Sequence, residues 1–302
     1  MRLAAAFLIA IAAYAQTAAE PPIAAEIRRV SARIGADVYL FAKNLDTGAE
    51  FGWRADERVR TASTIKLPIL CALYEKAARG EVKWDEMLVV READKVSGSG
   101  VLHEFSGGAR LAVRDVSNLM IVVSDNTATN LILDRISADA VNLYMDKLGL
   151  RQTRSMRKVR GDGTELKQAS GWSKAGLMEE NRRFGLGSST PREMVQLIEM
   201  LAAGKVVSAA ASREILATLE RQQYKDGIGR RLGGFRVASK SGALDALRSD
   251  VGLVTTPKGR IAMAITVDGM KDTDYSEDNA GLLAIAALAR QIVDGPDSPV
   301  VR

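Results

Sequence analysis

The chain has 302 residues, of which 47% are hydrophobic and 26% are charged, and its formal net charge at neutral pH is +5. This composition is that of an ordinary globular protein and excludes a collagen, a coiled coil and a disordered chain. A chain of this length buries a substantial core, in one large or two modest domains.

The first residues have the layout of an export signal. Arg2 gives a positive start, residues 3–13 form an uninterrupted apolar run, and small residues precede a predicted cut at Gln16. The apolar run is shorter than the roughly 20 residues that cross a bilayer. The sequence therefore predicts a cleaved signal peptide over 1–15, no membrane anchor, and an exported protein that is periplasmic or secreted.

The next elements combine a helix with a hairpin. Apolar residues recur at helical spacing over 22–34, which predicts a helix. Residues 38–42 and 50–53 are typical of two strands joined by a tight turn. A second helix is predicted over 64–78, because Gly80 follows it as a stop signal.

The middle of the chain is predicted to be helical. Its three expected helices cover 113–123, 128–136 and 138–148. Residues 150–189 carry many glycines and charges with little periodicity, which predicts a long loop region of a kind that is often functional. Thr190 is then the expected N-cap of another helix, with Pro191 at its first position and Glu193 completing a capping box.

The last third alternates between strands and ends in a helix. Strands are predicted over 235–239, 250–255 and 261–267, and an amphipathic helix over 276–293. Short turns favour antiparallel pairing. This order predicts an α+β fold with three α/β/α layers: an antiparallel sheet flanked by helices and interrupted by an all-helical subdomain, with the active site between them. In this single domain over 16–302, the sheet part would take 22–60 and 205–302, and the helical part 61–204.

Two residue types occur only once. Cys71 cannot form an intrachain disulfide, and its apolar surroundings over 67–73 predict a buried thiol. His103 is the only histidine, so a zinc site built from several imidazoles is impossible and a Ser-His-Asp triad would have to use it. We predict a loop or surface position for His103, and neither a metal nor a cofactor for the protein.

The densest basic stretch lies over 151–160. Such a stretch binds nucleic acid or an anionic cell wall in some proteins. A solvated loop or helix face is favoured here, because no aromatic residues interleave to stack on bases. Nucleic acid is therefore not an expected partner.

The first candidate for catalysis is a serine followed three residues later by a lysine. Ser63 and Lys66 begin a predicted helix, where this spacing lets the hydroxyl and the amine meet. A lysine whose pKa is lowered by burial or by other cations can accept the proton of the serine nucleophile. The helix N-terminus also supplies backbone N–H groups for an oxyanion. The same spacing recurs at Ser155 and Lys158, so this signal is weak alone.

Two further strings strengthen it. They are Ser124-Asp125-Asn126, between two helices, and Lys240-Ser241-Gly242, after the strand 235–239. A turn between helices presents polar side chains to a cleft. The Lys240 ammonium can hold a carboxylate, and Gly242 lets a substrate backbone approach closely.

The three strings, in this order, resemble the class A serine β-lactamases, a family within the penicillin-recognising serine hydrolases. The segments 99–102 and 113–131 and the pair Thr190-Pro191 are similar to that family too, so the resemblance covers nearly the whole mature chain. It implies a monomeric enzyme that degrades β-lactam antibiotics through an acyl-serine without a cofactor. The substrate it implies is a small β-lactam or a peptide ending like D-Ala-D-Ala.

The resemblance also implies a role for each matched residue. Ser63 would attack the β-lactam carbonyl, and Lys66 would accept or relay its proton. Ser124 would pass a proton to the departing ring nitrogen, and Asn126 would hydrogen-bond the side-chain amide of the substrate.

The remaining implied roles concern binding. Lys240 and Ser241 would hold the substrate carboxylate, and the backbone N–H groups of Ser63 and Ala243 would form the oxyanion hole. Arg248 would add a second cation for the carboxylate. A surface ion pair between Arg248 and Asp250 is the alternative interpretation.

One family motif is missing. Class A enzymes carry a Glu-x-x-Leu-Asn string in the loop before the Thr-Pro helix, and its glutamate orients the water that hydrolyses the acyl-enzyme. No such string occurs between residues 151 and 189. Glu165, Glu179 and Glu180 are candidates, but none has the right spacing, and a solvated loop carboxylate is the favoured interpretation of each.

The missing string keeps alternatives open. One is a DD-peptidase, an esterase or a penicillin-binding protein that acylates in the same way but deacylates slowly. A penicillin-binding sensor is disfavoured because no anchor or further domain is predicted, and an inactive relative because all three strings are intact.

Overall fold

The computed structural model describes residues 21–160, 171–296 and 298–301. The signal peptide predicted over 1–15, with its cut at Gln16, lies outside these residues.

The predicted antiparallel sheet is confirmed and has the strand order β2-β1-β10-β9-β8. Its strands are β1 (Asp37–Asn44), β2 (Glu50–Trp53), β8 (Arg236–Leu244), β9 (Leu247–Thr256) and β10 (Gly259–Asp268). Strands β8, β9 and β10 are longer than the alternation of apolar residues in the sequence predicts. Backbone pairing carries β8 on through Lys240, Ser241 and Gly242, where the side chains no longer alternate in polarity.

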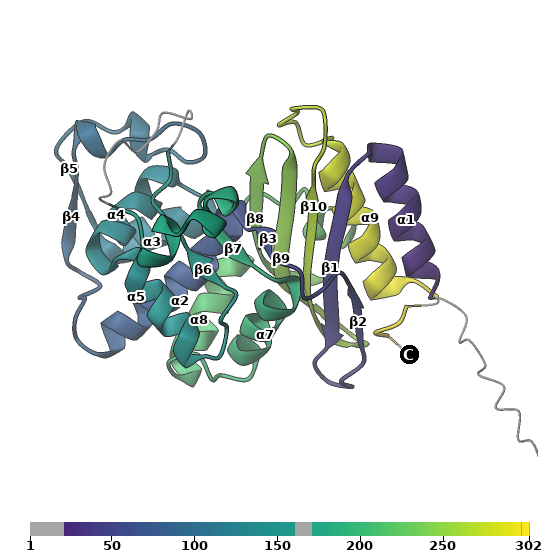
Figure 1. The fold of residues 1–302 in the computed structure, drawn as a ribbon. Helices are drawn as coiled ribbons and strands as arrows, with labels where there is room; N and C mark the ends of the chain where they lie inside the picture. The colour runs from purple at the N-terminus through teal and green to yellow at the C-terminus, as the bar shows by residue number, and fades with distance from the viewer. Residues whose placement is uncertain (1–20, 161–170, 297, 302) are drawn as a thin grey trace, which may run out of the picture.

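Two helices cover one face of this sheet (Figure 1). They are α1 (Pro22–Ile34) and α9 (Ala280–Asp294). Helix α9 starts four residues later than predicted, because the Asn279 side chain accepts hydrogen bonds from the N–H groups of Gly281 and Leu282 and so caps the helix.

The other face packs against the helical half of the molecule, which completes the three layers (Figure 1). The longer helices of that half are α2 (Lys66–Ala78), α3 (Val113–Val122), α4 (Asn126–Ile136), α5 (Ala138–Lys147), α7 (Pro191–Ala202) and α8 (Ala209–Glu220). Helix α2 lies at the centre, and residues 66–74 are all buried. Cys71 is fully buried there, as predicted.

The two faces of the sheet bury separate cores. Along β10, Met263 and Ile265 belong to the core under α1 and α9, whereas Ala262 and Ala264 belong to the core shared with the helical half. Successive side chains of a strand point to opposite faces, so large residues alternate with small ones. The alanines let α7 pack closely against β10.

The expectation of an all-helical middle is wrong in detail. A hairpin of β4 (Met87–Val90) and β5 (Ala109–Ala112) lies there, together with a small sheet of β3 (Val59–Arg60), β7 (Gly187–Ser189) and β6 (Arg154–Ser155). Strands of two to four residues are too short to show a periodic pattern. The predicted loop region also contains α6 (Lys174–Leu177) and a 3₁₀ segment, Glu179–Phe184.

The predicted capping box at the start of α7 is half right. Thr190 accepts a hydrogen bond from the backbone N–H of Glu193, which confirms the N-cap. The Glu193 carboxylate does not complete the box. It accepts from the backbone N–H of Gln152 and from the Thr153 hydroxyl, so it ties α7 to the start of the long loop region instead.

Candidate active site

The candidate nucleophile lies where a 3₁₀ turn runs into the central helix. Ser63 belongs to the 3₁₀ segment Ala62–Ile65, which continues directly as α2. The predicted helix start at Thr64 is therefore a tighter turn. Strand β8 passes against this turn: a Cβ on Gly242 would lie 2.8 Å from the Thr61 carbonyl oxygen and 3.0 Å from the Ser63 nitrogen. Glycine is required here for close packing of the strand itself, besides any substrate.

Lys66 reaches across from α2 to the start of α4. Its ammonium nitrogen Nζ lies 2.6 Å from the Ser124 carbonyl oxygen, 3.2 Å from Ser124 Oγ and 3.0 Å from Asn126 Oδ1. The side chain is fully buried. Burial, helped by the nearby Lys240 cation, holds the pKa of Lys66 well below its usual range.

Lys240 approaches Ser124 from the opposite side. Its Nζ donates to Ser124 Oγ at 3.0 Å and to the Ser241 carbonyl oxygen at 2.7 Å. Burial lowers the pKa of Lys240 to about 7, although the charge of Asp250 opposes the shift. Ser124 Oγ therefore lies between two amines that come from distant parts of the chain.

Ser124 adopts a backbone conformation that is uncommon for a residue with a side chain. Its φ is 52°, in the left-handed region. Asp125 fixes the turn: its carboxylate accepts from the N–H of Val101 at 2.6 Å, of Leu102 at 2.8 Å and of Ala128 at 2.7 Å. The middle residue of the string thus braces the loop and caps α4, while its neighbours face the lysines. Sequence reasoning gave Asp125 no such role.

The neutral form of at least one lysine is favoured at this site. The hydrogen bonds of the two ammonium groups go to carbonyl, hydroxyl and carboxamide oxygens, and within the described ranges neither amine forms an ion pair with a carboxylate. Burial of two cations costs more than the nearby charges of Asp125 and Asp250 offset, so one of the lysines releases its proton readily. A neutral Lys66 can act as a base.

The two ends of the Asn126 carboxamide bond to different parts of the molecule. Its Oδ1 accepts from Lys66, and its Nδ2 donates to the Ser97 carbonyl oxygen at 3.0 Å. The loop containing Ser97 also touches α4 through a bond from the Asn126 N–H to the Ser99 carbonyl oxygen. Asn126 therefore connects this loop, α4 and Lys66.

Arg248 does not form the surface ion pair with Asp250 that was the alternative to substrate binding. It is buried on β9 opposite Ala243 and donates to the carbonyl oxygens of Leu244, Leu247 and Asp274. Asp250 is buried as well and accepts from the Ile228 N–H, and burial raises its pKa to about 6. A role for Arg248 toward the substrate carboxylate stays a prediction.

The carboxylates suggested for deacylation lie apart from these contacts. Glu179 forms an exposed ion pair with Arg182, and Glu180 is exposed on the same 3₁₀ segment. Glu165 falls outside the described residues. The loop is tied to α4 by Asn130, whose carboxamide exchanges two hydrogen bonds with the backbone of Val159. No sequence signal pointed to this tie.

The loop or surface position predicted for His103 fits the structure. His103 lies in a short 3₁₀ turn, partly exposed, beside Glu104. Over the described residues, no cluster of acidic, histidine or cysteine side chains has the makings of a metal site, and no helix is long and apolar enough to cross a membrane. Within the basic stretch, Arg154 pairs with Asp146.

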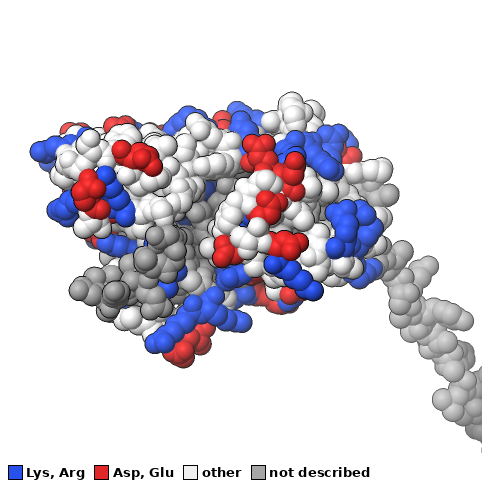
Figure 2. Space-filling view, turned by 90° about the horizontal axis from the view of Figure 1, so that it is seen from above, with Lys and Arg blue, Asp and Glu red and all other residues white. Residues whose placement is uncertain are grey.

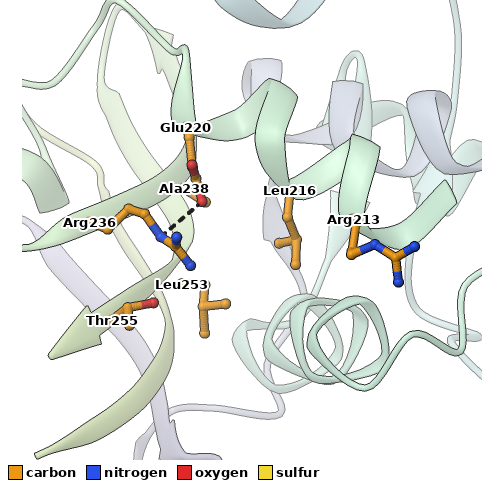
Figure 3. A pocket seen from close by; sticks show the side chains of 7 residues that line it. All are labelled: Arg213, Leu216, Glu220, Arg236, Ala238, Leu253 and Thr255. Atoms are coloured by element: carbon orange, nitrogen blue, oxygen red, sulfur yellow. Dashed lines mark ion pairs between the residues drawn. The ribbon is translucent and has the colours of Figure 1, made fainter. Parts of the chain in front are cut away.

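A cavity elsewhere does not belong to this site. It measures about 140 Å³ and lies between α8 and the outer ends of β8 and β9 (Figure 3). Arg236 pairs with Glu220 at its side, and Leu216 and Leu253 line it. Seen from above, the surface of the molecule is hollowed between the helical half and the sheet half (Figure 2).

A second serine, Ser124, thus lies between two buried amines within a three-layer α/β/α fold, an arrangement that fits a serine hydrolase. The family model of the β-lactamase enzyme family matches residues 22–295. The chain belongs to this family.

Individual relatives agree with this assignment. β-Lactamase L2 of Stenotrophomonas maltophilia is 25% identical over 263 residues, which cover 82% of this chain and 79% of the relative. The crystal structure of a β-lactamase from Sphaerobacter thermophilus is 32% identical, covers 89% of this chain and 94% of its own, and superposes with a TM-score of 0.77. A mutant of PBP-A, solved as an acyl-enzyme complex with penicillin G, is 26% identical with the same coverage and a TM-score of 0.74.

Proposed function

We propose that this protein is a β-lactamase that opens β-lactam rings through an acyl-enzyme on Ser63. The observation that carries the proposal is the convergence of Lys66 and Lys240 on the hydroxyl of Ser124, while Gly242, on the same strand as Lys240, packs against the turn that holds Ser63. Membership of the β-lactamase enzyme family supports a substrate with a β-lactam ring.

Acylation begins with Lys66 in its neutral form. Burial and the Lys240 charge favour that form, so Lys66 takes the Ser63 proton as the serine oxygen attacks the β-lactam carbonyl. The negative charge on the carbonyl oxygen would be held by the N–H groups of Ser63 and Ala243. The close packing of Gly242 against the turn of Ser63 supports this assignment.

Ring opening then needs a proton on the departing nitrogen. The protonated Lys66 lies 3.2 Å from Ser124 Oγ, so the Ser124 hydroxyl can give its proton to the nitrogen and recover one from Lys66. Lys240 lies on the other side of Ser124. When it is protonated, Lys240 holds the substrate carboxylate. One ring nitrogen is protonated, and one acyl-serine ester forms.

Hydrolysis of that ester needs a base for water. Lys66 is neutral again after the proton transfer and lies next to the ester, so we assign this step to Lys66 as well. Its hydrogen bonds to Ser124 and Asn126 keep it in place during both half-reactions. A DD-peptidase or penicillin-binding protein would share the first half-reaction and differ in the lifetime of the ester.

The test follows product and protein mass together. Purified mature protein is mixed with a chromogenic cephalosporin, and colour and mass are recorded over time. We expect many turnovers per protein and a short-lived adduct that is absent in Ser63→Ala. A single turnover with a lasting adduct would support the penicillin-binding protein instead, and no adduct at all would reject the assignment.

We also propose that the protein is exported and acts as a monomer. The support for export is the pattern of residues 1–15, with its positive start and short apolar run. Expression in a bacterial host, followed by N-terminal sequencing of the periplasmic fraction, should find a chain that begins at Gln16. A chain that retains Met1 in the cytoplasm would refute export.

A further inference from the structure

The cavity between α8 and the sheet has apolar walls (Figure 3). Leu216 comes from α8, and Ala238 and Leu253 come from paired positions of β8 and β9. The cavity volume of about 140 Å³ is close to the roughly 150 Å³ that holds one benzene molecule in another protein interior. The space therefore fits a single six-membered ring.

The charges around the cavity favour an anion. The lining contains the guanidinium groups of Arg213 and Arg236 and the carboxylate of Glu220, so one cation is in excess. Arg236 pairs with Glu220 at 3.2 Å. Arg213 is exposed on α8, and its guanidinium forms no hydrogen bond or ion pair with a described residue. An anionic group at the rim therefore gains from Arg213 without breaking an existing pair.

One wall of the cavity is the strand that carries Lys240. Ala238 and Lys240 are two residues apart on β8, so their side chains point to the same face of the sheet. Ala238 belongs to the core shared with the helical half, and Lys240 donates to Ser124 Oγ on that side. A molecule in the cavity therefore touches β8 two residues before the lysine of the active site.

The opposite wall, α8, is tied to the segment that leads to Ser124. The Gln222 carboxamide, just past the end of α8, donates to the Ile121 carbonyl oxygen at 2.9 Å. The N–H of the next residue, Gln223, donates to the carbonyl oxygen of Val122 at 3.0 Å. Both acceptors lie at the end of α3, and Ser124 follows two residues later. The separation of the two walls is therefore coupled to the contact between Ser124 and the lysine on β8.

We propose that the cavity is a regulatory binding site for a small aromatic carboxylate. The ring lies between Leu216 and Leu253, and the carboxylate pairs with Arg213. An empty cavity leaves its walls short of contacts, which favours arrangements in which α8 closes on the sheet and shifts Ser124 against Lys240. A bound ring excludes these arrangements. It therefore favours the arrangement with the 3.0 Å contact between the two side chains and raises the rate of acylation.

Binding is tested by isothermal titration calorimetry with three probes of similar shape, namely benzoate, benzamide and benzylammonium. We expect the benzoate anion to bind about tenfold more tightly than neutral benzamide, and the benzylammonium cation to bind least. Arg213→Gln should remove the advantage of benzoate over benzamide, because the anion then loses its partner at the rim. Benzoate that binds Arg213→Gln as tightly as the unmodified protein would overturn the proposal.

A matched control separates contact at the rim from general charge. Arg33 is an exposed arginine in the last turn of α1, which covers the other face of the sheet (Figure 1). Arg33→Gln changes the net charge of the chain by the same amount as Arg213→Gln, and it should leave the benzoate affinity unchanged. An equal loss of affinity in both variants would refute the site. Leu216→Phe fills the cavity from α8 and should abolish binding of benzoate and benzamide alike.

The effect on the reaction is measured by stopped-flow acylation with penicillin G. We expect saturating benzoate to raise the maximal acylation rate about fivefold, and to have no such effect on Arg213→Gln. Benzoate held at Lys240 would instead compete with the substrate carboxylate, so that KM rises while the maximal rate stays constant. Either that competition or an unchanged rate with benzoate bound would overturn the regulatory role.

The regulatory effect rests on the proposed function, whereas binding of the carboxylate does not. If benzoate binds through Arg213 but penicillin G does not acylate Ser63, the proposed function falls and the binding site stands. If penicillin G acylates Ser63 but benzoate does not bind, the cavity site is refuted and the proposed function stands.

Discussion

Two regions of the chain carry a serine followed three residues later by a lysine. They differ in the burial of the lysine and in the charge of its partners. Ser63 and Lys66 start the central helix, where the lysine is fully buried and its contacts are uncharged. Ser155 lies in a short strand, and Lys158 forms an ion pair with Asp134 near the surface. An ion pair keeps a lysine protonated, whereas burial without a carboxylate favours the neutral amine. Spacing alone therefore does not make a catalytic pair.

The largest contrast is expected at the two serines. Ser63→Ala removes the nucleophile, so hydrolysis of a chromogenic cephalosporin and the mass adduct should both disappear. Ser155→Ala removes a buried hydroxyl that makes no hydrogen bond with a described residue. Its turnover should equal that of the unmodified protein. Loss of activity in the Ser155 variant would contradict the distinction between the two regions.

Substitutions of Lys66 and Lys158 should differ in their effect on acylation by almost as much. Lys66→Arg keeps the positive charge but cannot release a proton, so acylation should slow by about a thousandfold. Lys158→Arg preserves a partly exposed ion pair whose contribution is about 0 to 1 kcal/mol, so neither the acylation rate nor the stability should change. Stopped-flow acylation by penicillin G measures the first effect. Acylation at an unchanged rate in Lys66→Arg would exclude Lys66 as the base.

The pH dependence sharpens the comparison, because only the first region depends on buried amines. Acylation needs Lys66 neutral, so its rate rises as pH rises through the lowered pKa of that residue. Binding of the substrate carboxylate needs Lys240 charged, so kcat/KM should fall about tenfold for each pH unit well above the Lys240 pKa of about 7. Lys240→Arg stays charged and should lose this alkaline limb. An identical alkaline limb in that variant would show that another group titrates there.

A very small effect on catalysis is expected from a substitution of Asn142, which holds the strand that contains Ser155. The Asn142 carboxamide accepts from the Ser155 N–H at 2.7 Å and donates to the Ser155 carbonyl oxygen at 3.0 Å. Asn142→Ala leaves both backbone groups unpaired, which should lower the free energy of unfolding by about 1–3 kcal/mol. Chemical denaturation measures this loss, and kcat/KM should stay within about twofold, as for surface changes away from a site. A large fall in kcat/KM would link Ser155 to catalysis.

Much of the fold follows from local patterns. Alternating apolar residues mark β9 and β10, and helical spacing marks α1 and α5, because each element buries one face whatever its partner. Elements of two to four residues, such as β3 and β6, have no such period. They form because distant segments meet: Val59 pairs with Ser189, and Arg154 with Ser188.

The residues of the candidate site could be predicted from the sequence for a different reason. Its residues lie at the ends of well-marked elements, and three short strings in a known order locate them. The contacts that hold these residues in place could not be predicted from the sequence. Asp125 bonds to the N–H groups of residues 23 and 24 positions earlier in the chain, so no local pattern records these bonds. The Glu193 carboxylate shows the same limit, since it bonds to Gln152 and Thr153 where a local rule assigns it to its own helix.

The single thiol in α2 makes the chain a convenient subject for spectroscopic labelling. Cys71 is fully buried, and burial raises its pKa far above the range in which thiolates react, so maleimide reagents should leave it untouched. Cysteines introduced at exposed positions would then be the only thiols that take a dye. Dyes at Leu143 on the helical half and Asp272 on the sheet half, both exposed, would report by energy transfer whether the two halves change their separation during turnover.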